Sequence, residues 1–384
     1  MPGHGVVPGH GVAPGHGATH GDDAAPGYGA APGVERSDGS IASSLHPDSA
    51  SGRGRGASLP GWGPQIADPG PGEIIGRHGG WAGLRSGDVR VDVQAAAAAL
   101  APLLGLRPLI DIDDATARVD VARASASMLT VVAAAARGDA LPPVPERLVA
   151  EGRDVTSQFM IRWRGEPDPR HVAAIDRYWV CAAEHGMNAS TFTARVVAST
   201  GADVGACLSA AVAALSGPLH GGAPARALGM VADVERTGDA RAYVKKVLDS
   251  GRRLMGFGHA IYRAEDPRAR ILRDTARELG APRYEVAREL EKAALAELRE
   301  RKPDRVLETN VEFWAAIVLD FAEVPVDLLA AMFTCARTAG WSAHILEQKR
   351  LGKIIRPSAD YVGPSARRPD ELPGWEAALK RRVA

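Results

Sequence analysis

The segment from residue 204 to residue 222 reads VGACLSAAVAALSGPLHGG. Its apolar side chains recur every three or four residues, which places them on one face of a helix. They are Val204, Cys207, Leu208, Ala211, Val212 and Leu215. Gly217-Pro218 then ends the helix, because proline lacks a backbone donor and disfavours helical geometry in the residue before it. The pattern therefore predicts a core helix that delivers His220 at the turn into the next helix.

Helical periodicity continues along the chain from about Val89, and no convincing run of strand-like alternation appears. A second apolar stripe precedes Arg337 and consists of Leu328, Leu329, Met332, Phe333 and Ala336. Such stripes usually form the core, so we expect an all-α protein. The charged residues between Arg283 and Arg305 are expected to be mostly the solvated face of a surface helix.

The first 75 residues differ in composition from the rest. Pro-Gly-His-Gly recurs at Pro2, Pro8 and Pro14, and five of the eleven histidines lie in this region. Because large apolar side chains are too few to offset the entropy cost of ordering, we expect a disordered tail. Its spaced imidazoles could bind a transition metal weakly, but a solvated linker is the favoured interpretation, and no metal site is assigned.

Composition excludes several classes of partner. With 384 residues and 45% hydrophobic content, the chain can form two domains with a sizeable core. Its formal net charge is zero, so no strong field favours nucleic acid or an anionic membrane. Cys181, Cys207 and Cys335 are too few and too scattered for a disulfide framework or a zinc site, which suits a reducing cytoplasm. We expect neither a signal peptide nor an apolar stretch of about 18 residues that could span a membrane.

Three side chains suit chemistry at the carbon next to a thioester carbonyl. Removing a proton there needs a carboxylate base and a donor that holds the developing enolate, while a second donor must polarise the ketone under attack. Glu312 could be the base, and His220 and His259 the donors. Each is ambiguous alone, because a turn histidine or an acidic residue in the first turn of a helix commonly has no catalytic role.

Arginines near helix ends suit a dicarboxylate co-substrate, since guanidinium binds carboxylates through two parallel hydrogen bonds. The candidates are Arg268, Arg337 and Arg356. Arg268 could instead only pair with Glu265 or Asp266 on the surface.

Several motifs in this order and register resemble the citrate synthase family over roughly residues 90 to 364. They are His185 before Asn188-Ala189-Ser190-Thr191-Phe192, Gly217-Pro218-Leu219-His220-Gly221-Gly222, Gly256-Phe257-Gly258-His259, Asp266-Pro267-Arg268, Asn310-Val311-Glu312, Ala336-Arg337-Thr338, and Arg356-Pro357 with Tyr361. The resemblance implies a helical fold of two domains, with a small domain at 223–325 inserted into a large domain at 89–222 and 326–384. It also implies a homodimer or larger assembly, because Arg356 would reach into the partner subunit's site.

The resemblance implies a Claisen-type condensation of acetyl-CoA with oxaloacetate. Glu312 would remove a methyl proton while His220 donates a hydrogen bond to the enolic oxygen. His259 would polarise the ketone and protonate it as the bond forms, and water would then hydrolyse the citryl thioester.

The same resemblance assigns the binding residues. Carboxylate groups would be held by His185, Arg268, Arg337 and Arg356. The turn Gly256-Phe257-Gly258 is assigned to the coenzyme; it lacks the third glycine of a dinucleotide-binding loop, so it does not indicate a nucleotide cofactor. Coenzyme A enters as a thioester substrate, and no permanently bound cofactor or metal is expected.

The sequence departs from the family at the base, because Glu312 stands where aspartate is usual. One extra methylene moves the carboxylate by about 1 Å, and such a displacement can lower a rate about a hundredfold unless the helix shifts. Three functions stay open: citrate synthase, a 2-methylcitrate synthase that prefers propionyl-CoA, and a protein that binds oxaloacetate or acyl-CoA without turnover. One methylene discriminates the first two by only about 1–3 kcal/mol. The third is disfavoured, because three histidines and three arginines would rarely all persist in an inactive site.

Overall fold

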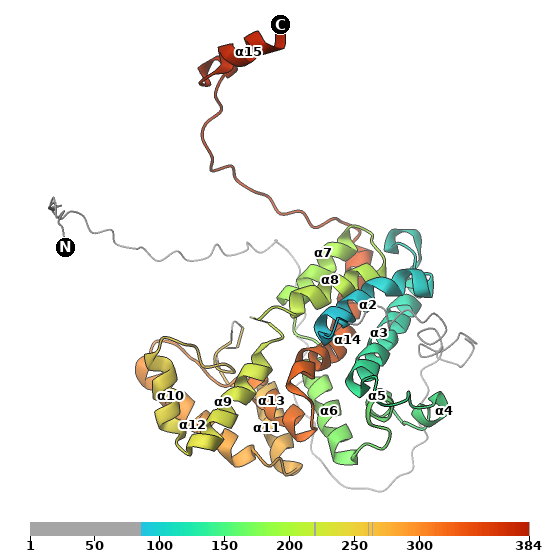
Figure 1. Ribbon diagram of the computed structural model, residues 1–384, viewed down its shortest axis with the longest axis vertical. Helices are drawn as coiled ribbons and strands as arrows, with labels where there is room; N and C mark the ends of the chain where they lie inside the picture. Colours follow the sequence, from blue (N-terminus) through green and yellow to red (C-terminus); the bar gives the residue numbers. More distant parts are fainter. Residues whose placement is uncertain (1–85, 219, 260, 263, 384) are drawn as a thin grey trace, which may run out of the picture. The chain divides into compact units, whose positions relative to one another are not determined.

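The computed structural model describes residues 86–218, 220–259, 261–262 and 264–383, so the tail at residues 1–75 lies outside it. Within these ranges the chain is helical and has no strand, only an isolated antiparallel bridge between Phe257 and Thr309. The all-α prediction is confirmed. The elements are α2 (Val89–Leu104), η2 (Leu109–Asp111), α3 (Asp114–Arg137), α4 (Glu146–Val149), α5 (Val155–Arg164), α6 (Pro169–Ala182), α7 (Ala189–Ser199), α8 (Val204–Leu215), α9 (Ala223–Thr237), α10 (Ala240–Asp249), α11 (Pro267–Glu278), α12 (Tyr284–Arg301), α13 (Val311–Phe321), η3 (Val326–Leu328), α14 (Leu329–Leu351), η4 (Pro369–Glu371) and α15 (Trp375–Val383). Figure 1 labels the α-helices.

Asparagine and aspartate side chains set the starts of the helices that later matter for the site. Asp203 accepts a hydrogen bond from the Ala206 amide and begins α8, while Asn188 and Asn310 cap α7 and α13 in the same way. These caps satisfy amide donors that have no partner within the helix. The apolar stripe predicted for α8 is confirmed, since all six of its residues are buried.

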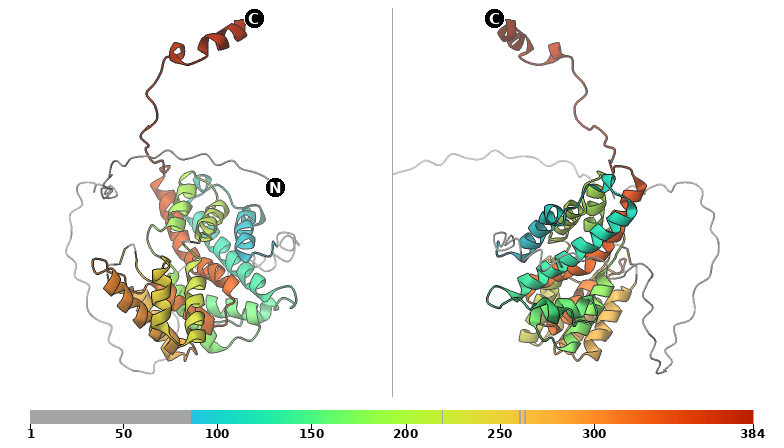
Figure 2. Two further views of the ribbon diagram at one scale, coloured as in Figure 1. Left: turned by 60° about the vertical axis from the view of Figure 1, so that its left-hand side comes forward. Right: turned by 90° about the vertical axis from the view of Figure 1, so that its right-hand side faces the viewer.

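The helices pack as two interconnected groups. Helix α8 packs against α2 and α7, and α3 packs against α2, α5 and α14. Helix α13 packs against α9 and α11, while α12 packs against α9 and α10. Helix α6 touches members of both groups, namely α5, α11, α13 and α14. Both views in Figure 2 show α14 running among these helices, and its contacts with α2, α3, α6, α7, α8 and α9 make it the central element.

One expectation from composition needs correction. The segments Val89–Asp111 and Asp114–Arg137 are long and apolar enough, by length and composition alone, to cross a membrane. Both are alanine-rich, and both contribute buried residues to the core, including Leu100 and Met128. Core helices of this kind pass the same test, so the observation is weak evidence for a membrane span.

Candidate active site

The turn that carries His259 is bonded to the segment that begins α13. The Gly258 amide donates to the Glu308 carbonyl (2.7 Å), and the Asn310 amide donates to the Gly256 carbonyl (2.9 Å). The Asn310 side chain adds a bond from Nδ2 to the Gly258 carbonyl at 2.8 Å. Both glycines have a φ of +85°, a conformation that other residues rarely adopt. The turn therefore fixes His259 beside the first turn of α13.

Backbone hydrogen bonds hold His259 in one tautomer. Its Nδ1 accepts from the amides of Ile261 (2.9 Å) and Tyr262 (3.1 Å), so the proton of the neutral ring is on Nε2. Burial, and then the positive charge of Arg268, lower the pKa of His259 below its usual value. The Nε2 atom lies 3.1 Å from Nε2 of His185. His259 thus presents one uncharged N–H donor.

His185 follows α6 and is the acceptor of that N–H. Burial, followed by the charge of Arg268, lowers the pKa of His185 to about 4, so its ring is neutral at pH 7. The rings of His185, His259 and Tyr262 pack together, with centroid separations of 5.0, 5.7 and 4.7 Å. The Arg268 guanidinium lies 5.7 Å from the Tyr262 centroid. Two neutral imidazoles and a cation therefore lie together on this side of the site.

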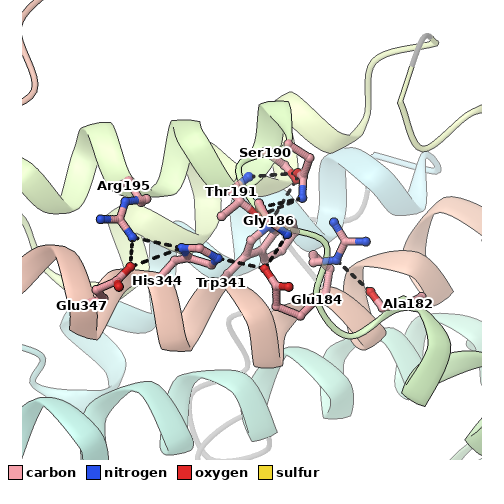
Figure 3. Close-up of polar contacts among 11 residues, drawn as sticks. Ala182, Glu184, Gly186, Ser190, Thr191, Arg195, Trp341, His344 and Glu347 are labelled. Atoms are coloured by element: carbon pink, nitrogen blue, oxygen red, sulfur yellow. Dashed lines mark hydrogen bonds and ion pairs between the residues drawn. The ribbon is translucent and has the colours of Figure 1, made fainter. Parts of the chain in front are cut away.

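His220 lies in the turn after α8 and contacts α7. Its Nε2 is 2.9 Å from Ser190 Oγ, which also lies 2.8 Å from Asn188 Oδ1 and accepts from Trp341 Nε1 at 3.2 Å (Figure 3 labels Ser190 and Trp341). The hydroxyl has one proton for two acceptors. When it points to His220, the neutral ring carries its proton on Nδ1 and can donate to a ligand. Burial, followed by the charge of Arg337, lowers the pKa of His220 to about 4.

Glu312 lies in the first turn of α13, where its amide donates to Asn310 Oδ1 at 3.0 Å. Burial raises the pKa of its carboxyl to about 7, although the charges of Arg268 and Arg337 act in the opposite direction. No hydrogen bond reaches this carboxylate from the part of the chain that the structure describes. A carboxylate that titrates near neutral pH without a bound donor is suited to take a proton.

Arg268 forms a buried pair with Asp266. The guanidinium donates through Nε (3.0 Å) and Nη2 (2.8 Å), and Asp266 is 1% exposed. The same carboxylate accepts from the Val311 amide at 3.0 Å, which ties the arginine to the start of α13. The ion pair of Arg268 with Asp266 is therefore largely buried and does not lie at the surface.

Arg337 is 2% exposed, and burial lowers its pKa to about 10, so it stays charged at neutral pH. Its Nε donates to the Ala182 carbonyl at 2.7 Å, and its guanidinium carbon lies 4.9 Å from the Phe333 centroid. Among the described residues, neither terminal nitrogen has a hydrogen-bond partner. Both remain able to bind a carboxylate in a bidentate manner.

Six of the seven expected catalytic and substrate-binding residues are thus connected by contact or by mutual effects on pKa: His185, His220, His259, Arg268, Glu312 and Arg337. Arg356 is not among them, since it belongs to an exposed segment after α14. The assignment of Gly256, Phe257 and Gly258 to the coenzyme stays a prediction, and the Gly258 amide is already used within the protein.

Sequence reasoning gave no role to Ser190, Tyr262 and Tyr178, and it considered Asp266 only as a surface partner of Arg268. Ser190 and Asp266 lie inside the quoted motifs, and Tyr262 follows His259 by three positions, so adjacency was the available signal. Tyr178 on α6 is 2% exposed, and burial together with the charge of Glu312 raises its pKa well above the usual value. No local pattern marks it, because its neighbours come from α13 and α14.

Comparison with known proteins relates most of this chain to one family. Residues 88–358 match the family model described as citrate synthase, C-terminal domain. A Mycobacterium tuberculosis protein named "Putative citrate synthase 2" is 68% identical over 296 residues, covering 77% of this chain and 79% of that protein. A 2-methylcitrate synthase from Shewanella oneidensis is 41% identical over 209 residues, or 53% of each chain.

A solved structure is also similar. It is the ternary complex of citrate synthase from Thermoplasma acidophilum with carboxymethyl coenzyme A and oxaloacetate, with a TM-score of 0.63 and 28% identity over 73% of this chain and 74% of that one. The family match covers well over half of the chain, and the mycobacterial relative matches most of its length. This chain belongs to the citrate synthase family.

Proposed function

We propose that this protein condenses acetyl-CoA with oxaloacetate and hydrolyses the product to citrate and coenzyme A. The observation that carries the proposal is Glu312, a buried carboxylate with a pKa of about 7 whose charge is favoured by the buried Arg337 and the partly buried Arg268. Such a group can take a proton at neutral pH and return it. The neutral histidines supply the donors that the reaction needs.

The first step forms the nucleophile. Glu312 takes a proton from the methyl carbon of the thioester, and the electron pair moves onto the carbonyl oxygen. His220 donates to that oxygen from Nδ1, in the tautomer that Ser190 selects when its hydroxyl points to the ring. A donor placed where charge develops lowers the barrier more than one matched to the substrate.

The second step forms the carbon–carbon bond. The methylene carbon attacks the keto carbon of oxaloacetate, and His259 gives its Nε2 proton to the oxygen that becomes the hydroxyl. The proton that Glu312 removed then returns to His259 through water, so both side chains regain their starting states. The observed tautomer of His259 supports this role, because its Nδ1 is occupied by backbone donors. Water then cleaves the citryl thioester and releases the thiol.

Oxaloacetate would be held through its carboxylates by Arg337, Arg268 and His185, with Arg356 of a second subunit completing the site. The free terminal nitrogens of Arg337 support this assignment. The related ternary complex from Thermoplasma acidophilum contains oxaloacetate together with a carboxymethyl derivative of coenzyme A, which agrees with this pair of substrates. No permanently bound cofactor is part of the proposal.

We further propose a small domain at 223–325 within a large domain at 89–222 and 326–384, a homodimer, and a cytoplasmic location. Packing of α9 with α12 and α13 supports the small domain. In that division His259, Arg268 and Glu312 lie on one side and His185 and Arg337 on the other, so domain closure would assemble the site.

A 2-methylcitrate synthase is the second candidate, and the Shewanella oneidensis relative favours it. The third possibility, binding without turnover, follows from the longer side chain of Glu312. The test is thiol release from acetyl-CoA and from propionyl-CoA, each with and without oxaloacetate, on the purified full-length protein. Oxaloacetate-dependent release supports the condensing enzyme, and the ratio of kcat/KM values identifies the acyl group. Saturable oxaloacetate binding without release from either thioester would overturn catalysis.

A further inference from the structure

The segment that leads into His185 is fixed to one face of α14. Arg337 Nε donates to the Ala182 carbonyl at 2.7 Å, and the Gly340 amide donates to the Ala183 carbonyl at 3.1 Å. The three contacting positions on α14 are 337, 340 and 344, which are spaced so that they share a face. Ala182 at the end of α6 and the next two residues, Ala183 and Glu184, are therefore held by successive turns of α14.

The third contact brackets His185 itself. Glu184 Oε1 lies 2.9 Å from His344 Nε2 and accepts from the Gly186 amide at 2.7 Å (Figure 3). Gly186 has a φ of +57°, which permits the sharp turn that this bond closes. The carboxylate of Glu184 thus fixes the chain on both sides of His185, and His344 holds that carboxylate in place.

Arg195 determines which nitrogen of His344 carries the proton. Its Nη1 lies 3.0 Å from His344 Nδ1, and guanidinium can only donate. His344 Nδ1 is therefore the acceptor, and the Nε2 proton of the neutral ring points to Glu184. Glu347 also accepts from Arg195 Nη1, as the dashed lines in Figure 3 show.

The chain of contacts continues to the end of α14. Arg195 Nε donates to Gln348 Oε1 at 3.1 Å, and Gln348 Nε2 donates to the Lys353 carbonyl at 3.0 Å. Gln348 is 4% exposed, so these bonds are protected from water. Lys353 precedes Arg356 by three residues.

We propose that His344 is a positioning residue for keto-acid binding. It does not touch the substrate; it holds Glu184, which orients His185, and it shares Arg195 with the bonds that fix the start of the segment bearing Arg356. This inference rests on the proposed function, because it assumes that His185 and Arg356 bind oxaloacetate. The network reaches the acyl-CoA side of the site less directly, because Asn188 Nδ2 donates to the Gly186 carbonyl at 3.4 Å and Ser190 links Asn188 to His220.

The kinetic test compares His344→Leu with wild type and with His171→Leu. His171 is a matched control, because it is a partly buried histidine whose ring contacts Phe321 at 5.3 Å and takes no part in the site. Loss of a hydrogen bond to a charged group predicts that His344→Leu raises the KM for oxaloacetate about ten- to a hundredfold. The KM for acyl-CoA stays within about twofold in both variants.

A conservative variant distinguishes positioning from general packing. His344→Gln has an amide that can accept from Arg195 and donate to Glu184, so it should recover most of the lost affinity for oxaloacetate. Thermal unfolding of all three variants shows whether each is folded. If His344→Leu does not fold, Glu184→Ala replaces it, because alanine removes the acceptor of both the Gly186 and the His344 bonds. A KM for oxaloacetate equal to wild type in folded Glu184→Ala overturns the proposal.

A spectroscopic readout does not depend on turnover. Because His259 donates from Nε2, the neutral ring of His185 carries its proton on Nδ1 in the wild type. Long-range ¹H–¹⁵N NMR of histidine-labelled protein should report this tautomer, and His344→Leu should shift the His185 ring toward the Nε2–H form while His171→Leu does not.

The outcomes separate the two proposals. Wild-type protein without oxaloacetate-dependent thiol release contradicts the proposed function, and the tautomer measurement then decides the positioning role by itself. An active wild type with an unchanged KM and an unchanged His185 tautomer in His344→Leu overturns the positioning role. Equal increases in both KM values would overturn it as well.

Discussion

The carboxyl of Glu312 has an unusually high pKa because its buried position disfavours the ionised form. Burial raises its pKa to about 7 even though Arg268 and Arg337 are close enough to lower it. A buried carboxylate that lost one of these cations would ionise at still higher pH. The arginines proposed to bind the substrate therefore also lower the pKa of the proposed base.

The pH dependence of kcat/KM for the acyl thioester should follow this pKa. Proton removal requires the ionised carboxylate, so the rate should fall about tenfold per pH unit below about pH 7 and level off above it. Initial rates at saturating oxaloacetate between pH 5.5 and about 9 would measure this. Glu312→Gln should be inactive throughout, and a wild-type profile that is flat down to pH 5.5 would assign the base elsewhere.

Arg337→Lys should weaken oxaloacetate binding while the chain still folds. Lysine cannot form two parallel bonds to a carboxylate, and it also loses the Nε contact with Ala182. We expect the KM for oxaloacetate to rise about ten- to a hundredfold, with a smaller change in the KM for acyl-CoA. The exposed Arg170→Lys is the control, and similar kinetics in both variants would remove Arg337 from the keto-acid site.

The turn before α13 has little tolerance for added atoms. A Cβ on Gly256 would lie 2.7 Å from the Cβ of buried Phe313, and the residue has a φ of +85°. Gly256→Ala should therefore lower the free energy of unfolding by about 2–4 kcal/mol, measured by urea titration. Gly280→Ala separates the two causes, since Gly280 has a φ of +71° but no neighbour within 4 Å of the added atom. If both variants lost the same free energy of unfolding, crowding against Phe313 would have no effect on stability.

Helices with a strong apolar stripe could be predicted from the sequence. The pattern of α8 predicts both its buried face and its end before Gly217, because period and helix-terminating residues are local properties. The stripe ahead of Arg337 lies in α14 except for Leu328, which ends η3, and α14 is buried on more faces than one stripe suggests. Alanine-rich α2 and α3 show the limit of composition, since a core helix and a membrane span use similar residues.

The site could be predicted only where residues stand in recognisable motifs. His185, His220, His259 and Glu312 belong to such motifs, and the fold brings their segments together. His344 could not be predicted, because its partners Glu184 and Arg195 lie about 150 residues away along the chain. Those contacts form only where α14 packs against α7 and against the end of α6, and no local pattern encodes this packing.

The exposed position of Arg356 makes the assembly testable. If the arginine completes the site of the other subunit, a mixture of Glu312→Ala and Arg356→Ala chains should regain activity, because one site in each mixed dimer is intact. Random exchange of equal amounts predicts about a quarter of the wild-type specific activity. Each variant alone should be nearly inactive, and no recovery after exchange would place Arg356 in its own subunit's site or outside any site.

The first turn of α13 is fixed from two sides, by Asn310 on Gly258 and by Asp266 on the Val311 amide. The helix therefore has little freedom to slide and absorb a change in side-chain length at position 312. How far the base extends is set by the number of its methylene groups, one carbon at a time. Acyl groups also differ by single carbons, so under the proposed function the extra methylene of Glu312 changes the reach of the base by the same step that separates an acetyl from a propionyl group.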